Sequence, residues 1–382
     1  MRQKRDFDWE IYALDDLLNY EQPTAYIVES TDYNDNYQTP VLTAGKSFII
    51  GYTNETSGIY KSLPVIIFDD FTTSSQYVNF PFKVKSSAMK ILSPNTELVL
   101  PKFIYYRMQI IQFDHSTHKR YWIQQYSKIK VKIPPIPEQE RIVSKIEELF
   151  SKLDASVAEL QTAKEKLKVY RQAVLFRAFQ NLADTITMDQ IADMIDPQPS
   201  HRTPPEVMNG IPYIGVGDID YAVRKVKFGE ARKVSPAVLQ EHLERYTLHK
   251  GDFIMGKIGT IGKPFIVPLP QNYTLSANVI LIQPNSEKIV PEFLYWQFSS
   301  PLVTQQLTTG AAATSQPAFG IKKARLLSIK MCSVEQQRQI VSEIEGVLSI
   351  CDSIQQTIDT SLQQAEALRQ SILKQAFGGR LV

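Results

Sequence analysis

The 382-residue chain lacks the features of a membrane-spanning, secreted or disulfide-bonded protein. No run of 18 apolar residues occurs, so no transmembrane helix is expected. The first ten residues, MRQKRDFDWE, turn acidic where a secretory signal would turn apolar. There are only two cysteines, Cys332 and Cys351, and such sparse usage is typical of a reduced compartment. These absences predict a cytoplasmic protein without a membrane partner.

The motifs of common catalytic sites are also missing. The chain has no Gly-x-x-x-x-Gly-Lys-Ser/Thr loop, no Gly-x-Gly-x-x-Gly, no His-Glu-x-x-His, no Cys-x-x-Cys and no Asn-Pro-Pro-aromatic sequence. His115 and His118 lack a cluster of further ligands, so we expect no metal site. Asp69 and Asp70 are not accompanied by the Glu-x-Lys of metal nucleases, which favours turn residues. The sequence therefore predicts a protein without catalytic residues or a cofactor of its own.

The net charge of +2 is small, but the basic residues are unevenly distributed. Seven Lys or Arg and one acid, Asp114, lie between Leu98 and Pro137. Four Lys or Arg and no acid lie between Phe293 and Val334. Either stretch alone is typical of a solvated face. Their similar positions, each just before a repeated helix, favour nucleic-acid binding.

A long internal repeat organises the chain. The segment from Glu138 to Phe179 returns between Glu335 and Phe377, and from Ile142 the copies align without a gap at an offset of 198 residues. Thirteen of the 38 aligned pairs are identical, among them Asp154/Asp352, Arg171/Arg369, Gln172/Gln370 and Leu175/Leu373. A repeat of this length is the first feature to interpret.

Both copies have the apolar spacing of a long helix with one seam, interrupted by an irregular step near the middle. Prolines precede the first helix, and Gly378 and Gly379 end the second. Such a helix needs a partner for its apolar stripe, and the other copy is the expected one; packing of each helix on its own domain is the alternative. The predicted interface comprises Ile146, Leu149, Leu153, Leu160, Leu167, Ile344, Val347, Cys351, Ile358 and Leu368.

Each long helix follows a region of short strands and turns. Strands are expected at residues 46–51, 64–68, 78–85 and 89–92, and a helix is expected near residues 101–109. The second region repeats this plan loosely, as in Leu248–Gly256 and Ile289–Gln297. We therefore predict domains at residues 1–137 and 182–332 and long helices at residues 138–181 and 333–382.

These elements predict an α+β protein with two globular α/β domains separated by a pair of long antiparallel helices in a coiled coil. Antiparallel helices would relate the two halves by an internal pseudo-two-fold axis, with the domains held at a fixed spacing. Duplex DNA has local two-folds and repeats about every 34 Å. Because the domains differ in sequence, a divided and asymmetric DNA target would suit such a protein.

The sequence resembles the specificity subunit of type I restriction–modification systems. The resemblance is carried by Ile133–Val143 (IPPIPEQERIV), by its second copy VEQQRQIV at residues 334–341, and by the C-terminal segment Arg369–Val382. Family-like segments also include Gly251–Gly259 and Ser276–Val279. The match covers the whole chain, although Cys332–Val334 stands where prolines are usual.

The resemblance implies a non-catalytic, DNA-binding subunit with two target-recognition domains, each recognising one half of a bipartite target. It implies that the paired helices set the spacer and dock two modification (methyltransferase) subunits, and that a restriction or motor subunit joins them. S-adenosylmethionine, ATP and magnesium would then belong to the partners. The adenine to be methylated would be flipped out of the duplex.

Candidate DNA contacts are basic, polar and aromatic residues in loops. In the first domain they are Lys83, Lys85, His118, Lys119, Arg120 and Tyr121; in the second they are Lys257, Thr260, Lys263, Thr314, Ser315, Gln316, Lys322 and Lys323. Two other functions stay open at this point. One is a two-headed coiled-coil adaptor that binds proteins, and the other is a nuclease or methyltransferase in its own right.

Overall fold

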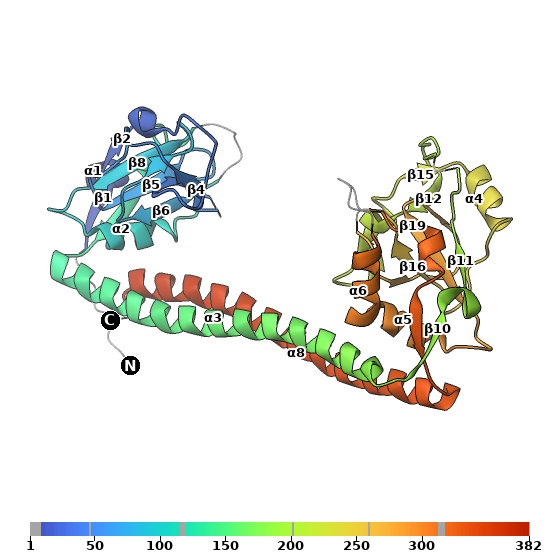
Figure 1. Cartoon of the computed structure of the whole chain (residues 1–382). Coiled ribbons are helices and arrows are strands. Elements are labelled where there is room, and N and C mark those ends of the chain that lie inside the picture. The colour runs from blue at the N-terminus through green and yellow to red at the C-terminus, as the bar shows by residue number, and fades with distance from the viewer. Residues whose placement is uncertain are drawn as a thin grey trace. The chain divides into compact units, whose positions relative to one another are not determined.

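The computed structural model describes residues 9–45, 47–114, 120–200, 202–258, 260–311 and 318–381. The chain forms two compact units, Met1–Gln161 with Asp359–Val382, and Thr162–Ile358. Each unit combines one globular part with one half of each long helix (Figure 1). The predicted boundaries, in contrast, set the helices apart from the globular domains.

The globular part of the first unit is built from two sheets and a two-stranded ribbon. The four-stranded sheet has the order β2 (Leu18–Glu21), β8 (Met89–Pro94), β5 (Val65–Asp69), β6 (Ser75–Val78), and all its pairs are antiparallel. The three-stranded sheet has the order β4 (Ile49–Thr53), β3 (Thr39–Leu42), β7 (Lys83–Val84), with β3 and β7 parallel. The ribbon pairs β1 (Glu10–Ala13) with β9 (Lys130–Ile133), and the helices are α1 (Leu14–Leu17) and α2 (Pro101–Met108).

The second unit repeats this topology. Its four-stranded sheet has the order β11 (Ala192–Ile195), β19 (Val279–Pro284), β16 (Phe253–Gly256), β17 (Phe265–Ile266). Its three-stranded sheet has the order β15 (Lys233–Val234), β12 (Ile211–Ile214), β18 (Thr274–Leu275), again with one parallel pair, and its ribbon joins β10 (Asp184–Thr187) to β20 (Ser328–Met331). Further elements are β13 (Ile219–Asp220), β14 (Lys225–Val226), α4 (Pro236–Leu243), α5 (Pro291–Phe298), α6 (Pro301–Gly310) and α7 (Ile321–Ala324). The internal repeat is thus a repeat of fold, beyond the sequence identity of the helices.

Local chemistry explains most of these elements. Proline occupies the first turn of both α2 and α5, where its missing N–H removes no helical hydrogen bond. The strand predicted at residues 78–85 is wrong as a single element, because β6 ends at Val78 and β7 begins at Lys83. Pro81 lies in the gap and cannot donate to a sheet ladder.

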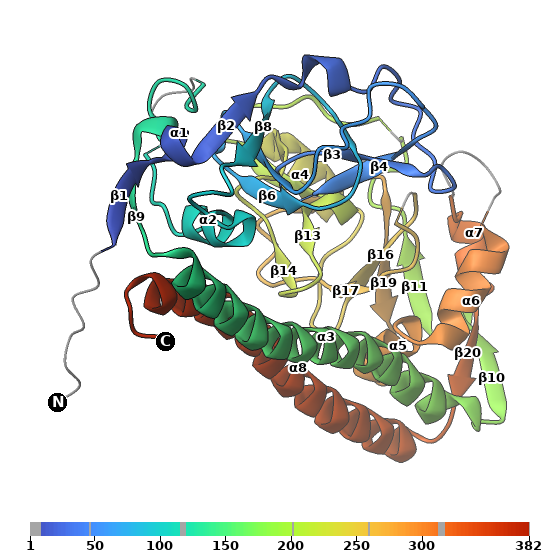
Figure 2. The ribbon, with the colours of Figure 1, turned by 90° about the vertical axis from the view of Figure 1, so that its left-hand side faces the viewer.

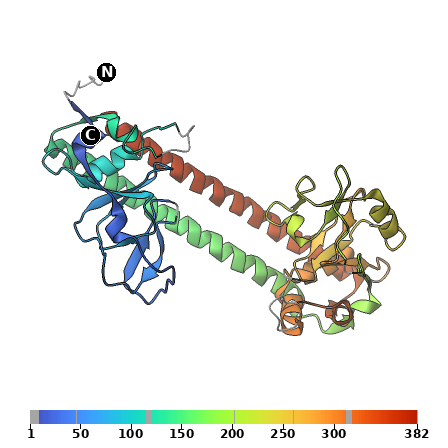
Figure 3. The ribbon, with the colours of Figure 1, turned by 90° about the horizontal axis from the view of Figure 1, so that it is seen from above.

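The two long helices are α3 (Ile136–Gln180) and α8 (Val334–Phe377), which lie side by side in Figures 1, 2 and 3. In the first unit, Ile146 and Phe150 of α3 share one core with Ile372 and Leu373 of α8. In the second unit, Leu175 and Phe179 of α3 share a core with Ile344 and Leu348 of α8. The beginning of each helix therefore packs beside the end of the other, and the pair is antiparallel.

The seam of these helices is a regular heptad pattern. Buried or partly buried residues recur every seven positions at 146, 153, 160, 167 and 174 in α3, and at 344, 351, 358, 365 and 372 in α8. Among the predicted interface residues, Ile146, Leu167, Ile344, Cys351 and Ile358 are buried, and Leu149, Leu153, Leu160 and Val347 are partly buried. Leu368 is 50% exposed, so assigning it to the interface was wrong. The charged neighbour Arg369 is partly buried there and pairs with Asp154 of α3.

Two equivalent ion pairs cross this seam. In the second unit, Arg171 Nη1 of α3 lies 2.7 Å from Asp352 Oδ1 of α8. In the first unit, Arg369 of α8 pairs with Asp154 of α3, and its guanidinium also lies 4.4 Å from the centre of the Phe150 ring. Both arginines and both aspartates are related by the 198-residue repeat. The same contact is therefore made twice with the roles of the helices exchanged.

A buried glutamine fixes the start of each long helix to the globular part. Gln139 is fully buried; its side-chain oxygen accepts from Leu100 N at 2.8 Å, and its amide donates to Leu98 O and Pro134 O. Gln337, its repeat, accepts from Val290 N at 2.8 Å and donates to Cys332 O. Leu100 and Val290 are the residues that precede α2 and α5. One side chain thus joins two helix starts in each unit.

We expect Gln139→Ala to destabilise the first unit by at least about 2 kcal/mol, because buried main-chain groups lose their partners. Urea denaturation followed by circular dichroism measures this change. Gln161→Ala removes an exposed glutamine of the same helix and serves as the control, with a change below about 0.5 kcal/mol. Equal stabilities of the two variants would contradict the assigned role.

Candidate nucleic-acid interface

The structure sorts the fourteen predicted DNA contacts into three groups. Six are exposed, namely Lys85, Arg120, Thr260, Lys263, Lys322 and Lys323. Three are buried, namely Lys83, Tyr121 and Lys257. The remaining five, His118, Lys119, Thr314, Ser315 and Gln316, lie outside the described residues. The exposed residues remain predictions.

The three buried residues have internal roles that remove them as DNA contacts. Lys83 is 3% exposed; its ammonium lies 2.8 Å from Glu55 Oε2 and donates to Ser57 O at 2.9 Å. Tyr121 is 1% exposed and packs in the aromatic core of the first unit. Lys257 is 9% exposed, and its ammonium donates to Asp196 Oδ2 at 2.7 Å. Charge and aromaticity in the sequence could not distinguish these buried residues from surface residues.

Hydrogen bonds to the end of one central strand position the candidate loop of the first domain. Asp70 follows β5; its backbone oxygen accepts from Tyr121 N at 3.0 Å, and its carboxylate accepts from Trp122 N at 2.7 Å. Asp70 is itself buried and lies 3.5 Å from Lys90 Nζ. The prediction that Asp70 is only a turn residue missed this role, because its partners lie 20 and 52 positions away in the sequence.

The second domain has an equivalent arrangement. Phe319 N donates to Lys257 O at 2.9 Å just after β16, and Ile258 forms a bridge with Ala318. These bonds bring the segment that contains Lys257 to Lys263 beside the described residues that flank Thr314–Gln316. Ala318 and Phe319, which are far from Lys257 and Ile258 in the sequence, are therefore their neighbours at one edge of this domain.

Glycine is required in the turn that follows β16. A Cβ on Gly256 would lie 1.7 Å from the carbonyl oxygen of Thr260, and Gly262 has a φ of +78° with Leu307 against it. Only glycine tolerates this approach and this backbone conformation. The turn presents the exposed residues Thr260 and Lys263.

Exposed cations lie on both sides of this edge in the second domain. Lys263 Nζ lies 5.4 Å from the centre of the Tyr221 ring, within the range of a cation–π contact. Lys322 and Lys323 are exposed on α7, and Lys323 donates to Gly310 O at 2.9 Å. Ammonium groups that project to solvent in this way can contact phosphates.

In the first domain, the ribbon carries two exposed cations that were not among the predicted contacts. Lys130 and Lys132 of β9 alternate with the buried Val131 and Ile133. This period of two, with lysine at every outward position, was a signal in the sequence for an exposed basic edge.

The described residues offer little for metal chemistry. They contain no group of three or more His, Cys, Asp or Glu side chains placed to hold a metal ion. Over the same ranges, no helix combines the length and apolar character needed to span a bilayer. The surface features that remain are basic loops and the helix pair.

Comparison with known proteins shows which protein family this chain matches. The model of the type I restriction modification DNA specificity domain matches residues 7–165 and again residues 201–364. The specificity subunit of the type I restriction enzyme EcoR124I/EcoR124II of Escherichia coli is 45% identical over 178 residues, which cover 44% of each chain. The EcoBI specificity subunit of Escherichia coli is 26% identical over 276 residues, covering 65% of this chain and 58% of its own. The matches thus span about half the length of these relatives.

The fold agrees with one solved structure. A chain from work on complex assembly and conformational transition of the type I restriction–modification system superposes with a TM-score of 0.70. The superposition covers 97% of this chain and 98% of the other at 16% sequence identity, so it supports the fold alone. The family model, in contrast, matches both halves and most of the sequence. This chain belongs to the family of type I restriction–modification DNA specificity subunits.

Proposed function

We propose that this chain recognises DNA sequence as the non-catalytic specificity subunit of a type I restriction–modification complex. The observation that carries the proposal is the duplication of the family domain within one chain. Two domains of one topology, each with its own residues at the candidate edge, suit a target with two unlike halves. The helix pair would set the spacer between those halves.

The proposal assigns the chemistry to partners. The modification subunits would bind S-adenosylmethionine and methylate adenine, and a restriction subunit would use ATP and magnesium. Two modification subunits would dock on the helix pair. This chain would contribute DNA contacts and the positions of its partners, with charge-based contacts to phosphates and loop contacts to base edges.

Methylome sequencing tests the proposal most directly. Cells that contain this chain and its modification subunit should methylate one bipartite motif, and deletion of the gene should remove all of that methylation. Exchange of residues 182–332 for those of a relative should change one half of the motif and leave the other. An unchanged methylome after deletion would contradict the proposal and favour an adaptor that binds proteins.

The Lys119→Ala/Arg120→Ala double variant should weaken DNA binding by the assembled complex and flatten its salt dependence. Each lost phosphate contact lowers the slope of log K against log salt by about one, so the expected decrease is about two. Fluorescence anisotropy across a salt series measures it. Lys166→Ala removes an exposed cation of α3 and is the control. A slope equal to that of the wild type would remove the pair from the interface.

Lys83→Met should instead lower stability and leave the salt slope unchanged. Burial raises the pKa of the Glu55 carboxyl, but hydrogen bonds from Lys83 and from the backbone outweigh it and hold this pKa below its usual value. The ion pair therefore stabilises the fold at neutral pH, and this contribution is lost as the pH falls through the lowered pKa. Removing Lys83 leaves Glu55 unpaired, at a cost of roughly 3 kcal/mol.

Urea denaturation at pH 7 measures that loss, and Lys85→Met, just after the strand β7, is the control because its side chain is exposed. A changed salt slope for Lys83→Met with normal stability would return Lys83 to the DNA contacts.

A further inference from the structure

The two-stranded ribbon of the first unit, which lies at the margin of its globular part in Figure 2, has an open edge. Its strands β1 and β9 are antiparallel, and Leu14 N continues the ladder by donating to Ile129 O at 3.1 Å. Bonded and non-bonded pairs alternate along such a ladder, so Lys130 and Lys132 direct their backbone N–H and C=O groups away from β1. No residue that the structure describes forms a hydrogen bond with these outward groups.

In the second unit, side chains close the equivalent edge. Ser328 and Lys330 of β20 are the repeats of the two lysines, at the same offset of 198 residues. Gln306 accepts from Ser328 N and donates to Ser328 O, both at 2.9 Å. Gln297 accepts from Lys330 N and donates to Lys330 O, both at 2.8 Å. Each amide therefore makes the two hydrogen bonds that a residue of a neighbouring strand would make.

In the first unit, a cation takes the place of one of these glutamines. Proline is the first residue of both α2 and α5, and Arg107 and Gln297 are the seventh residues. Arg107 is half-buried, and its guanidinium forms no hydrogen bond or ion pair with a described residue. Burial lowers its pKa, because desolvation disfavours the charged form. The described part of the first unit also has no counterpart of α6, the helix that carries Gln306.

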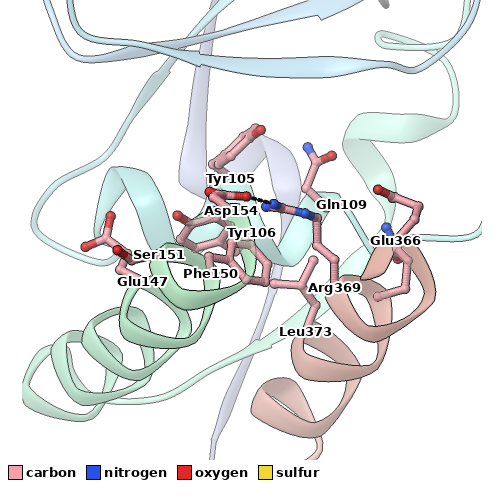
Figure 4. Close-up of a pocket in the computed structure, with 11 residues that line it drawn as sticks. Tyr105, Tyr106, Gln109, Glu147, Phe150, Ser151, Asp154, Glu366, Arg369 and Leu373 are labelled. Atoms are coloured by element: carbon pink, nitrogen blue, oxygen red, sulfur yellow. Dashed lines mark hydrogen bonds and ion pairs between the residues drawn. The ribbon is translucent and has the colours of Figure 1, made fainter. Parts of the chain in front are cut away.

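The open edge carries positive charge that the chain does not neutralise. The side chains of both edge lysines are exposed, and neither ammonium forms an ion pair with a residue in the described ranges. The cleft shown in Figure 4 differs in this respect, because Arg369 pairs there with Asp154 and Glu147 pairs with Lys102. Opposite charges attract, so the edge of β9 favours a negatively charged partner.

The main-chain groups of the edge favour a polypeptide over DNA. N–H donors and C=O acceptors stand side by side, and an extended chain can pair with both kinds at once. Phosphate oxygens only accept hydrogen bonds, so DNA would leave the carbonyl groups of Lys130 and Lys132 without a donor. The edge therefore matches an extended segment with acidic side chains.

The same lysines disfavour a second copy of this chain at the edge. Two copies of β9 side by side would place lysine beside lysine, and like charges directly opposite each other destabilise a strand pair. Lysine on an exposed edge strand is a common protection against such pairing. A strand with acidic residues at these positions meets no repulsion, so the edge distinguishes between partners by charge.

We propose that the open edge of β9 binds an extended acidic segment of a partner protein, which adds to the ribbon as a third strand. Acidic residues two positions apart stand opposite Lys130 and Lys132, and the residue between them is apolar because it faces the covered side of the ribbon. Arg107 donates to a carbonyl group of the same segment. Because glutamines close the edge of β20, each chain binds one such segment. The proposal goes beyond the proposed function, since it requires no DNA.

The test titrates the peptide Ser-Thr-Glu-Val-Glu-Thr-Ser into the full chain without DNA and measures binding by calorimetry. The wild-type chain should bind one peptide. The same peptide with methyl groups on its three central backbone nitrogens keeps both charges and should bind at least about tenfold more weakly, because it loses main-chain hydrogen bonds. The double variant Lys130→Glu/Lys132→Glu should lose the acidic peptide and bind Ser-Thr-Lys-Val-Lys-Thr-Ser instead. Lys166→Glu, an exposed position of α3, is the control and should change neither affinity.

A matched pair of variants separates the main chain from the charge. Lys132→Ala removes the ammonium alone, whereas Lys132→Pro also removes the outward N–H, which an edge strand tolerates. The proline variant should bind the acidic peptide more weakly than the alanine variant, and thermal unfolding verifies that both fold. Equal binding of the methylated and unmethylated peptides to the wild-type chain would overturn the proposal, as would no binding at about 1 mM peptide. These results leave the proposed function untouched, because the methylome tests that function separately.

Discussion

The constraint on which the structure depends is the register of the long helices, and two ion pairs of the same composition mark it. Arg369 meets Asp154 in one unit, and Arg171 meets Asp352 in the other. Because the partners are related by one repeat, a single antiparallel register satisfies both contacts. A parallel in-register pair would place arginine beside arginine and aspartate beside aspartate. The duplicated sequence therefore disfavours the parallel arrangement by charge repulsion.

These ion pairs favour the antiparallel register over the parallel one, but they add little to the stability of the fold. The side chains of Asp154 and Asp352 are 60% and 55% exposed, and exposed ion pairs typically contribute at most about 1 kcal/mol. Most of the stabilisation comes from the apolar residues beside them, where the ends of the helices join the cores of the globular parts. The seam holds the helices together, and the charges and the buried glutamines determine which segments meet.

The helices and their direction could be predicted from the sequence, because apolar spacing and an ungapped repeat are local patterns. The assignment of Leu368 to the seam was wrong for a physical reason. A leucine and an arginine are neighbours there, and hydrophobicity favours the leucine, whereas the long arginine stem can pack in the seam while its charge pairs with Asp154. The burial of two lysines of the candidate site was harder to predict. Lys83 and Lys257 are buried and pair with acids that lie 28 and 61 positions away in the sequence. Only the fold brings those acids close.

Comparison of the two halves separates what a residue does for the fold from what it does for a partner. Gln139 and Gln337 are repeated because each satisfies main-chain groups within its unit. Ser151 and Ser349 are repeated without such a contact, although they lie one residue from Lys152 and Ile350, where the halves have diverged. The loops at the candidate DNA edges differ between the halves, as two unlike half-sites require. The pairs Ser144/Ser342 and Thr162/Thr360 are likewise exposed and identical, so the repeated helices keep polar positions on their surface that neither core explains.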